Sequence, residues 1–324
     1  MEIKVLKTFE LSNNDWVQII DGFNSSFHRL ISFERLKSFY EGNVLGYSYH
    51  ALGFEDDKLI GFNSIIPYKY LFGEDEIIIG QSCSSFVLKE YRKDIFIFKD
   101  LYDALWTVCS KDSFITFVGV PNKNSYKYSI VFMKHIEIGT LPYFALPVRI
   151  SKALNKPTLF ILDLFSYLSA YGISLLSSIS FIINSKEKKA VCRIDTNENF
   201  YNKRFPDALY TYYQSGNTKA WYRIVKEEGI RTAYIMEFIE NGVRTSKALI
   251  KIVWHILLKE KPDMILFVGT LCLKQFSLIK LPKKYEPKNL PLMYNQASIM
   301  EKRKYESLSK LHTWNFSLMN FDVR

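Results

Sequence analysis

The sequence has only four cysteines, and no two of them are close together. Cys83, Cys109, Cys192 and Cys272 form no Cys-x-x-Cys pair, so the pattern indicates neither a disulfide framework nor a zinc site and is typical of a reducing compartment. The five histidines are also scattered, and no His-Glu-x-x-His or similar metal-ligand spacing occurs. We therefore expect no catalytic metal.

Signatures of several other protein classes are missing as well. Gly80 to Ser84 lacks the closing glycine of a Gly-x-Ser-x-Gly nucleophile elbow. There is no phosphate-binding loop of the Gly-x-x-x-x-Gly-Lys type and no Gly-x-Gly-x-x-Gly fingerprint. Met1 to Lys7 alternates like a strand and has no long apolar core of a secretory signal. The expected location is cytoplasmic.

The overall composition is that of a globular protein and is rich in aromatic residues. The 324 residues are 48% hydrophobic and 23% charged, and they include 25 Phe and 21 Tyr. Such a chain can form two domains with substantial β-structure. Its net charge is +10, and residues 244–310 contain 14 Lys or Arg against 5 Asp or Glu. This excess forms either a solvated surface or a face for an anionic partner, such as a nucleotide cofactor, RNA or a membrane.

The hydrophobic spacing predicts a strand, two helices and an antiparallel meander, followed by a helix and another strand. The predicted strands are 2–9, 47–54, 58–70, 76–88 and 114–120, the predicted helices are 15–23, 27–40, 95–110 and about 125–134, and 137–147 is extended. Asn14 is the predicted N-cap of the first helix.

The last third of the chain repeats this order. The spacing predicts a strand at 231–239, a helix at 244–258 and a strand at 263–270, then a further helix and an extended segment at 290–294. Phe117-Val-Gly119 and Phe267-Val-Gly269 lie 150 residues apart, each after a helix and a lysine-containing turn. Together these features indicate two copies of one unit.

Residues 164–184 contain no charge, and 21 such residues are long enough to cross a bilayer. Six serines and Gly172 dilute the segment, and a helix between two domains can also be apolar on most sides. We interpret it as an interdomain helix. A membrane-contacting helix and a true span remain alternatives.

Three segments together resemble the acyl-CoA N-acyltransferase (GNAT) superfamily. They are Gly61-Phe-Asn-Ser-Ile-Ile-Pro67, Ile79-Gly-Gln-Ser-Cys-Ser-Ser-Phe-Val-Leu-Lys-Glu-Tyr-Arg92 and Val118-Gly-Val-Pro-Asn-Lys-Asn-Ser125. The resemblance implies an α+β, layered fold with two tandem GNAT-like domains, each a mixed, largely antiparallel sheet flanked by helices. The implied division is 1–150, an apolar helical linker at 151–195, and 196–324.

The resemblance also implies a site for acetyl-CoA or another acyl-CoA. Phe86, Val87 and Leu88 would offer a backbone edge to the pantetheine arm, and the turn Arg92, Lys93, Asp94, Ile95, Phe96 and Ile97 would hold the diphosphate at a helix N-terminus. Asn122, Asn124 and Ser125 would complete the site from the next loop. The family's turn is rich in glycine, whereas this one has none, and the Asp94 carboxylate would repel a phosphate.

Three residues are candidates for catalysis within this resemblance. Tyr126 and Tyr128 follow the Pro-Asn loop and could protonate a leaving thiolate, while Ser84 lies on a strand that faces the expected cleft. The two tyrosines could equally pack in a core with the hydroxyl at its edge.

The resulting hypothesis is an acyltransferase that moves an acetyl or acyl group from coenzyme A to an amine or hydroxyl acceptor, a small molecule or a saccharide such as an amino sugar. One alternative is an aminoacyl-tRNA-dependent peptidyl transferase-like enzyme, since the basic C-terminal half would suit RNA. A catalytically silent binding module is the other.

Overall fold

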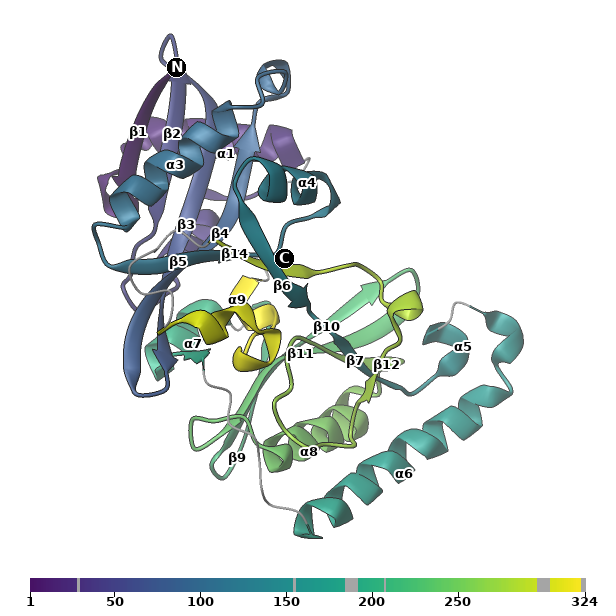
Figure 1. Ribbon diagram of the computed structural model, residues 1–324. Coiled ribbons are helices and arrows are strands. Elements are labelled where there is room, and N and C mark those ends of the chain that lie inside the picture. The colour runs from purple at the N-terminus through teal and green to yellow at the C-terminus, as the bar shows by residue number, and fades with distance from the viewer. Residues whose placement is uncertain (28–29, 154–155, 184–191, 207, 296–303, 322–324) are drawn as a thin grey trace.

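The computed structural model (Figure 1) describes residues 1–27, 30–153, 156–183, 192–206, 208–295 and 304–321. Its strands are β1 Glu2–Lys7, β2 Tyr49–Glu55, β3 Lys58–Phe72, β4 Asp75–Val87, β5 Phe114–Gly119, β6 His135–Thr140, β7 Tyr143–Pro147, β8 Cys192–Ile194, β9 Thr211–Ser215, β10 Thr218–Glu227, β11 Ile230–Glu240, β12 Met264–Val268, β13 Ile279–Lys280 and β14 Pro291–Asn295. Its α-helices are α1 Asn13–Phe27, α2 Phe33–Glu41, α3 Ile97–Cys109, α4 Lys123–Val131, α5 Ile150–Ala153, α6 Leu162–Ile183, α7 Glu198–Arg204, α8 Ser246–His255 and α9 Leu318–Phe321.

The strands form two mixed sheets flanked by helices, as predicted. The first sheet has the order β1-β2-β3-β4-β5-β14-β6, with β8 beside β3, and the second has the order β13-β7-β12-β11-β10-β9. Neighbours are antiparallel except for one parallel pair in each sheet, β4 with β5 and β11 with β12. The repeated order of elements in the sequence therefore becomes a repeated topology.

The two sheets exchange strands. β7 follows the elements of the first sheet in sequence but pairs with β12 and β13 of the second. β14 comes from the last third of the chain but pairs with β5 and β6 of the first sheet. The division at residue 150 stays a prediction. The hydrogen-bonded sheets do not follow it, because each contains a strand from the other half.

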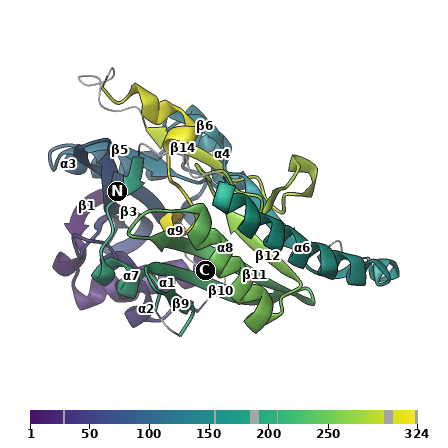
Figure 2. The ribbon, with the colours of Figure 1, turned by 90° about the horizontal axis from the view of Figure 1, so that it is seen from below.

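Helices cover both faces of the first sheet. α3 buries its apolar stripe, which includes Ile97, Leu101 and Leu105, against β1, β2 and β3. α1 covers β3 and β4 from the other side, where Trp16 and Ile19 are buried. In the second sheet α8 lies on β10 and β11, and α6 lies along α8 on the outside of the molecule (Figure 2).

Some predicted bounds were wrong, and the caps explain why. The first helix begins at Asn13, because Ser12 and Asp15 exchange hydrogen bonds across its first turn. The second begins only at Phe33, where the Ser32 hydroxyl caps the N–H of Arg35. The helix predicted after β12 is absent from the described residues there, a segment interrupted by Pro282 and Pro287.

Candidate functional site

The edges of β4 and β5 separate halfway along β4. Their parallel pairing runs from Ile78 to Gln81 and ends there, so the stretch Ser82–Val87 has no strand beside it on that side among the described residues. On its other edge β5 pairs with β14, through Val118 and Gly119. The separation leaves β4 backbone groups available to an extended ligand.

A bulge in β4 lies within the separated stretch. The register with β3 shifts between Phe62 and Ser64, and Ser84 takes a left-handed backbone with φ of 51°. The Ser85 hydroxyl donates a hydrogen bond to the Asn63 side-chain oxygen, 2.6 Å away. The bulge turns Ser84 out of the regular strand alternation.

Buried polar atoms without partners lie beside the bulge. The Asn63 amide nitrogen and the Gln81 side-chain oxygen are both inaccessible, and neither has a hydrogen-bond partner in the described part of the chain. Such atoms are costly unless a ligand or water pairs with them. The two atoms lie on β3 and β4, next to the stretch where β4 has no neighbour on its other side among the described residues.

Cys83 is not suited to nucleophilic attack. Its Sγ lies 3.4 Å from the Ser64 hydroxyl, and burial raises the pKa of the thiol to about 11. The group thus stays protonated near neutral pH, and the thiolate is the reactive form of cysteine.

The turn before α3 offers free backbone donors despite its lack of glycine. The N–H groups of Lys93, Ile95 and Ile97 donate to no protein acceptor within the described ranges. Phe96 donates its N–H to the Asp94 carboxylate at 2.9 Å, so Asp94 does close the turn as the sequence suggested. Arg92 donates from Nε to the Val87 carbonyl, 2.8 Å away, which ties the turn to the end of β4.

Asp94 lines a hollow on the β1 side of α3, with a volume of about 610 Å³. Glu55, Glu90 and Asp100 also line it, and Lys93 is its only cation. Four carboxylates against one lysine repel a phosphate. The hollow contains no β5 residue, but Lys93 and Ile97 of the turn line it together with Asp94, so an anion held at this turn would lie close to these carboxylates.

The predicted loop residues cap α4. The Asn122 side chain accepts the N–H groups of Asn124 and Ser125, and the Ser125 hydroxyl returns a bond to Asn122. The cofactor role of all three stays a prediction.

The two candidate tyrosines make hydrogen bonds through their hydroxyls. Tyr126 donates to Glu137 at 2.5 Å, and this carboxylate raises the pKa of Tyr126. Tyr128 donates to the carbonyl of Ile95 and therefore links α4 to the turn before α3. Burial raises the pKa of Tyr128. Their catalytic role stays a prediction.

A cavity of about 380 Å³ lies on the other side of the bulge, between α1, α2 and the segment around α7. Ser84 lines it, together with the apolar side chains of Phe23, Ile31, Phe39 and Leu209. Its charged lining residues are Glu34, Arg35, Lys203 and Arg204. Ser84 therefore faces a cavity that both halves of the chain build.

Arg204 is the contribution that sequence reasoning missed. It is buried at the end of α7, and its guanidinium donates to the carbonyls of Met319 and Leu318. Arg204 belongs to the second half of the chain, and only the tertiary fold brings it close to the first sheet. Asn63 and Gln81 were missed too, although a polar residue inside an apolar strand run is a signal that could have found them.

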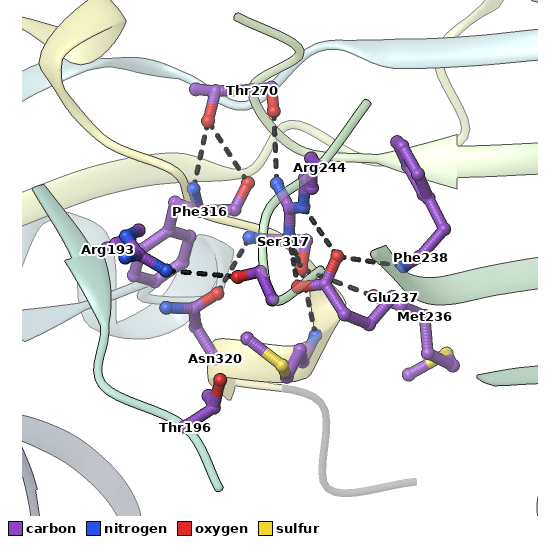
Figure 3. A network of polar contacts seen from close by, with 12 residues as sticks. Arg193, Thr196, Met236, Glu237, Phe238, Arg244, Thr270, Phe316, Ser317 and Asn320 are labelled. Carbon is purple, nitrogen blue, oxygen red and sulfur yellow. Dashed lines mark hydrogen bonds and ion pairs between the residues drawn. The ribbon is translucent and has the colours of Figure 1, made fainter. Parts of the chain in front are cut away.

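The second sheet repeats the separation, but its own chain fills the space (Figure 3). β11 leaves β12 after Ile235. Thr270 donates its N–H to the Phe316 carbonyl at 2.8 Å, and Ser317 donates to the Met236 carbonyl at 3.3 Å. The Phe316 carbonyl lies only 2.1 Å from where a Cβ on Gly269 would be, so glycine is required there.

A buried ion pair closes the same space. Arg244 donates to both carboxylate oxygens of Glu237, at 2.5 and 2.7 Å, and also to the Ser317 hydroxyl at 2.8 Å (Figure 3). The side chains of this pair are 5% and 3% exposed. The second opening therefore holds protein, whereas in the first no described strand pairs with Ser82–Val87 on the β5 side.

Comparison with solved structures identifies this architecture. A GCN5-related N-acetyltransferase from Anabaena variabilis matches with a TM-score of 0.54 and 12% identity over 90% of this chain and 72% of that one. A conserved protein from Enterococcus faecalis, described as a probable N-acyltransferase, matches at 0.55 and 13% over 91% and 72%. A GCN5-related N-acetyltransferase from Kribbella flavida matches at 0.56 and 9% over 90% and 70%.

The chain has the GNAT fold. The match spans nearly the whole chain, so it includes both sheets and confirms the predicted fold class. No protein-family model and no curated protein sequence matches this chain. At 9 to 13% identity the likeness concerns the fold.

Proposed function

We propose that this protein is an acyltransferase that moves an acetyl or other acyl group from coenzyme A to an amine acceptor at the opening between β4 and β5. The observation that carries the proposal is the unpaired edge Ser82–Val87, which leads to free N–H groups at the start of α3. The GNAT fold of the N-acetyltransferases it resembles supports the same reaction class. The filled second opening supports the choice of the first as the acyl-CoA site.

Coenzyme A, when bound, would supply an acyl group activated as a thioester. The β4 edge, including Phe86 and Val87, would pair with the pantetheine arm as an added strand does. The N–H groups of Lys93, Ile95 and Ile97 would hold the diphosphate, favoured by the partial positive charge at the N-terminus of α3. A free β4 N–H beside the bulge would stabilise negative charge on the acyl oxygen.

The acceptor would approach from the cavity that Ser84 lines. Its amine nitrogen must lose a proton as it attacks the acyl carbon, and Glu34 is the carboxylate lining this cavity. The Ser84 hydroxyl, placed between cavity and opening, would donate a hydrogen bond to the departing sulfur. Of the three predicted catalytic residues, Ser84 is the one that this geometry favours.

The cavity lining narrows the acceptor class. Phe23, Ile31, Phe39 and Leu209 present apolar surface, and a volume of about 380 Å³ suits a small molecule. These side chains favour an amine with an apolar portion, and Ser32, Ser38 and Tyr210 in the same lining would pair with its polar groups.

Binding of acetyl-CoA, followed by calorimetry and by thermal unfolding, tests the proposal. Asp94→Asn keeps an oxygen for the Phe96 N–H but removes the negative charge. We expect it to tighten acetyl-CoA about two- to fivefold, the equivalent of roughly 0.5–1 kcal/mol at a helix N-terminus. Asp103→Asn, an equal charge change in the middle of α3, is the matched control and should leave the affinity nearly unchanged.

If acetyl-CoA neither binds nor stabilises either the wild-type protein or Asp94→Asn, the acyltransferase proposal is wrong and the fold acts as a silent binding module. Salt-sensitive binding of tRNA without protection by acetyl-CoA would favour the aminoacyl-tRNA alternative.

A further inference from the structure

The outer face of α6 is a continuous apolar stripe. Leu164, Phe165, Leu168, Leu175, Leu176 and Ile179 are each between 49% and 64% exposed. Their spacing of three, four and seven residues places them on one face of the helix. α6 is also the one helix among the described residues that is long and apolar enough to cross a membrane, yet only 17% of Leu162–Ile179 is buried.

The inner face of α6 is fixed to the second half of the protein. Ala170 is 1% exposed, and Trp254 on α8 donates its indole N–H to the Ser178 hydroxyl at 3.1 Å. Tyr171 reaches the carbonyl of Leu257, 3.4 Å away. Crossing a bilayer would require α6 to leave α8 and expose its partners. The arrangement is therefore that of a helix lying on a surface with one face free.

The serines of α6 do not make it polar. Ser174, Ser177 and Ser178 each donate a hydroxyl hydrogen bond to the carbonyl four residues earlier, at 2.8 to 2.9 Å, and Ser166 donates to the carbonyl of Pro147 at 3.1 Å. Hydroxyls satisfied within the protein need no water. These four hydroxyls can thus enter an apolar phase without losing a hydrogen-bond partner, while Ser169 is exposed.

The charges next to α6 fit an anionic surface. Asp163, at the start of the helix, accepts hydrogen bonds from the N–H and hydroxyl of Ser151, so its charge is held by the protein. Lys152 and Lys156 are exposed and form no ion pair with any described residue. An uncharged stripe beside exposed lysines is complementary to lipid tails and anionic headgroups.

We propose that α6 is a peripheral membrane-binding helix whose stripe enters the interface of an anionic lipid bilayer while its inner face stays on α8. The stripe meets acyl chains, which need no hydrogen-bond partners, and Lys152 and Lys156 meet the headgroups. The inference is independent of the acyl transfer proposed above, since α6 lies on the second half.

Co-flotation of the full chain with vesicles tests this proposal. Vesicles of phosphatidylcholine with about one third phosphatidylserine should bind the protein, and pure phosphatidylcholine should bind it several times more weakly. Leu175→Glu combined with Leu176→Glu should weaken binding to the anionic vesicles at least tenfold. Val17→Glu, at a residue on α1 that is 57% exposed, is the matched control and should bind like wild type.

Circular dichroism and the melting temperature show whether the double variant is folded, and both substitutions are at exposed positions. A second variant, Lys152→Gln with Lys156→Gln, should lose most of the preference for anionic vesicles and keep the weak binding to neutral ones. Unchanged flotation of the leucine variant overturns the proposal. So does a wild-type protein that ignores vesicles but self-associates through α6, shown by a concentration-dependent sedimentation coefficient that the leucine variant loses.

Discussion

Ser84 combines a strained backbone with a position at the candidate site. Its φ of 51° lies in the left-handed region, where a residue with a Cβ costs of the order of 1 kcal/mol. Strain of this kind persists where the surrounding structure imposes it, often at functional sites. The residue was expected on the strand from the sequence. The bulge that turns it toward the cavity was not, because a register shift depends on the partner strand.

Substitution of Ser84 by glycine tests this strain. Glycine adopts positive φ without a steric cost, so Ser84→Gly should raise the free energy of unfolding by about 0.5–1 kcal/mol. The neighbouring Ser85→Gly should lower it by a similar amount, because Ser85 has no positive φ and loses its bond to Asn63. Urea unfolding measures both. A loss of stability in both variants would argue against strain at Ser84.

At the scale of elements, periodicity predicted most strands and helices of the first sheet, and β11, β12 and α8 of the second, but not β9, β10 or β13. It placed β2, β3, β4 and β5 within two residues of their bounds, since their apolar runs end at turns such as Asp56-Asp57, both with positive φ. Periodicity could not show which strands pair. The extended segment 290–294 was predicted, but its pairing with β5 was not, since the contact joins residues about 175 apart in the chain.

Among the contacts between elements, the ion pair that joins the loop before α8 to β11 has the clearest consequence for stability. Arg244→Met would leave the Glu237 carboxylate, 3% exposed, without its partner. We expect the free energy of unfolding to fall by about 3–5 kcal/mol. Arg244→Met with Glu237→Met removes both charges and should lose much less. Guanidinium unfolding measures the difference.

Lys58→Met is the matched control for that substitution. It breaks the pair with Glu90, in which both side chains are more than half exposed, and should leave the stability nearly unchanged. Equal losses for Arg244→Met and Lys58→Met would mean that burial of the Arg244 pair has no special weight.

The whole molecule is organised by the exchange of β7 and β14 between the sheets. Each half lacks a strand that the other supplies, and the C-terminal stretch around Phe316 and Ser317 fills the opening of the second sheet. The acceptor-side cavity likewise needs α7 from the second half and α1 and α2 from the first. These shared elements couple the halves.

We therefore expect the chain to unfold in one cooperative transition. Scanning calorimetry should give a calorimetric enthalpy equal to the van't Hoff enthalpy, which is the test of two-state behaviour. The fluorescence of Trp16, in the first half, should change at the same temperature. Two separate heat-absorption peaks would show that strand exchange does not join the halves.

The sequence by itself determined the local elements, their repetition and the resemblance to the GNAT fold, because hydrophobic period, turn residues and caps act over a few positions. It also located the turn before α3, which depends on neighbours in the chain, although Asp94 bonds the Phe96 N–H within this turn and does not cap α3. Only the tertiary structure decided that the second opening is filled while no described strand fills the first, and that Ser84 and Arg204 line one cavity. Those facts rest on contacts between distant segments, whose geometry no local pattern encodes.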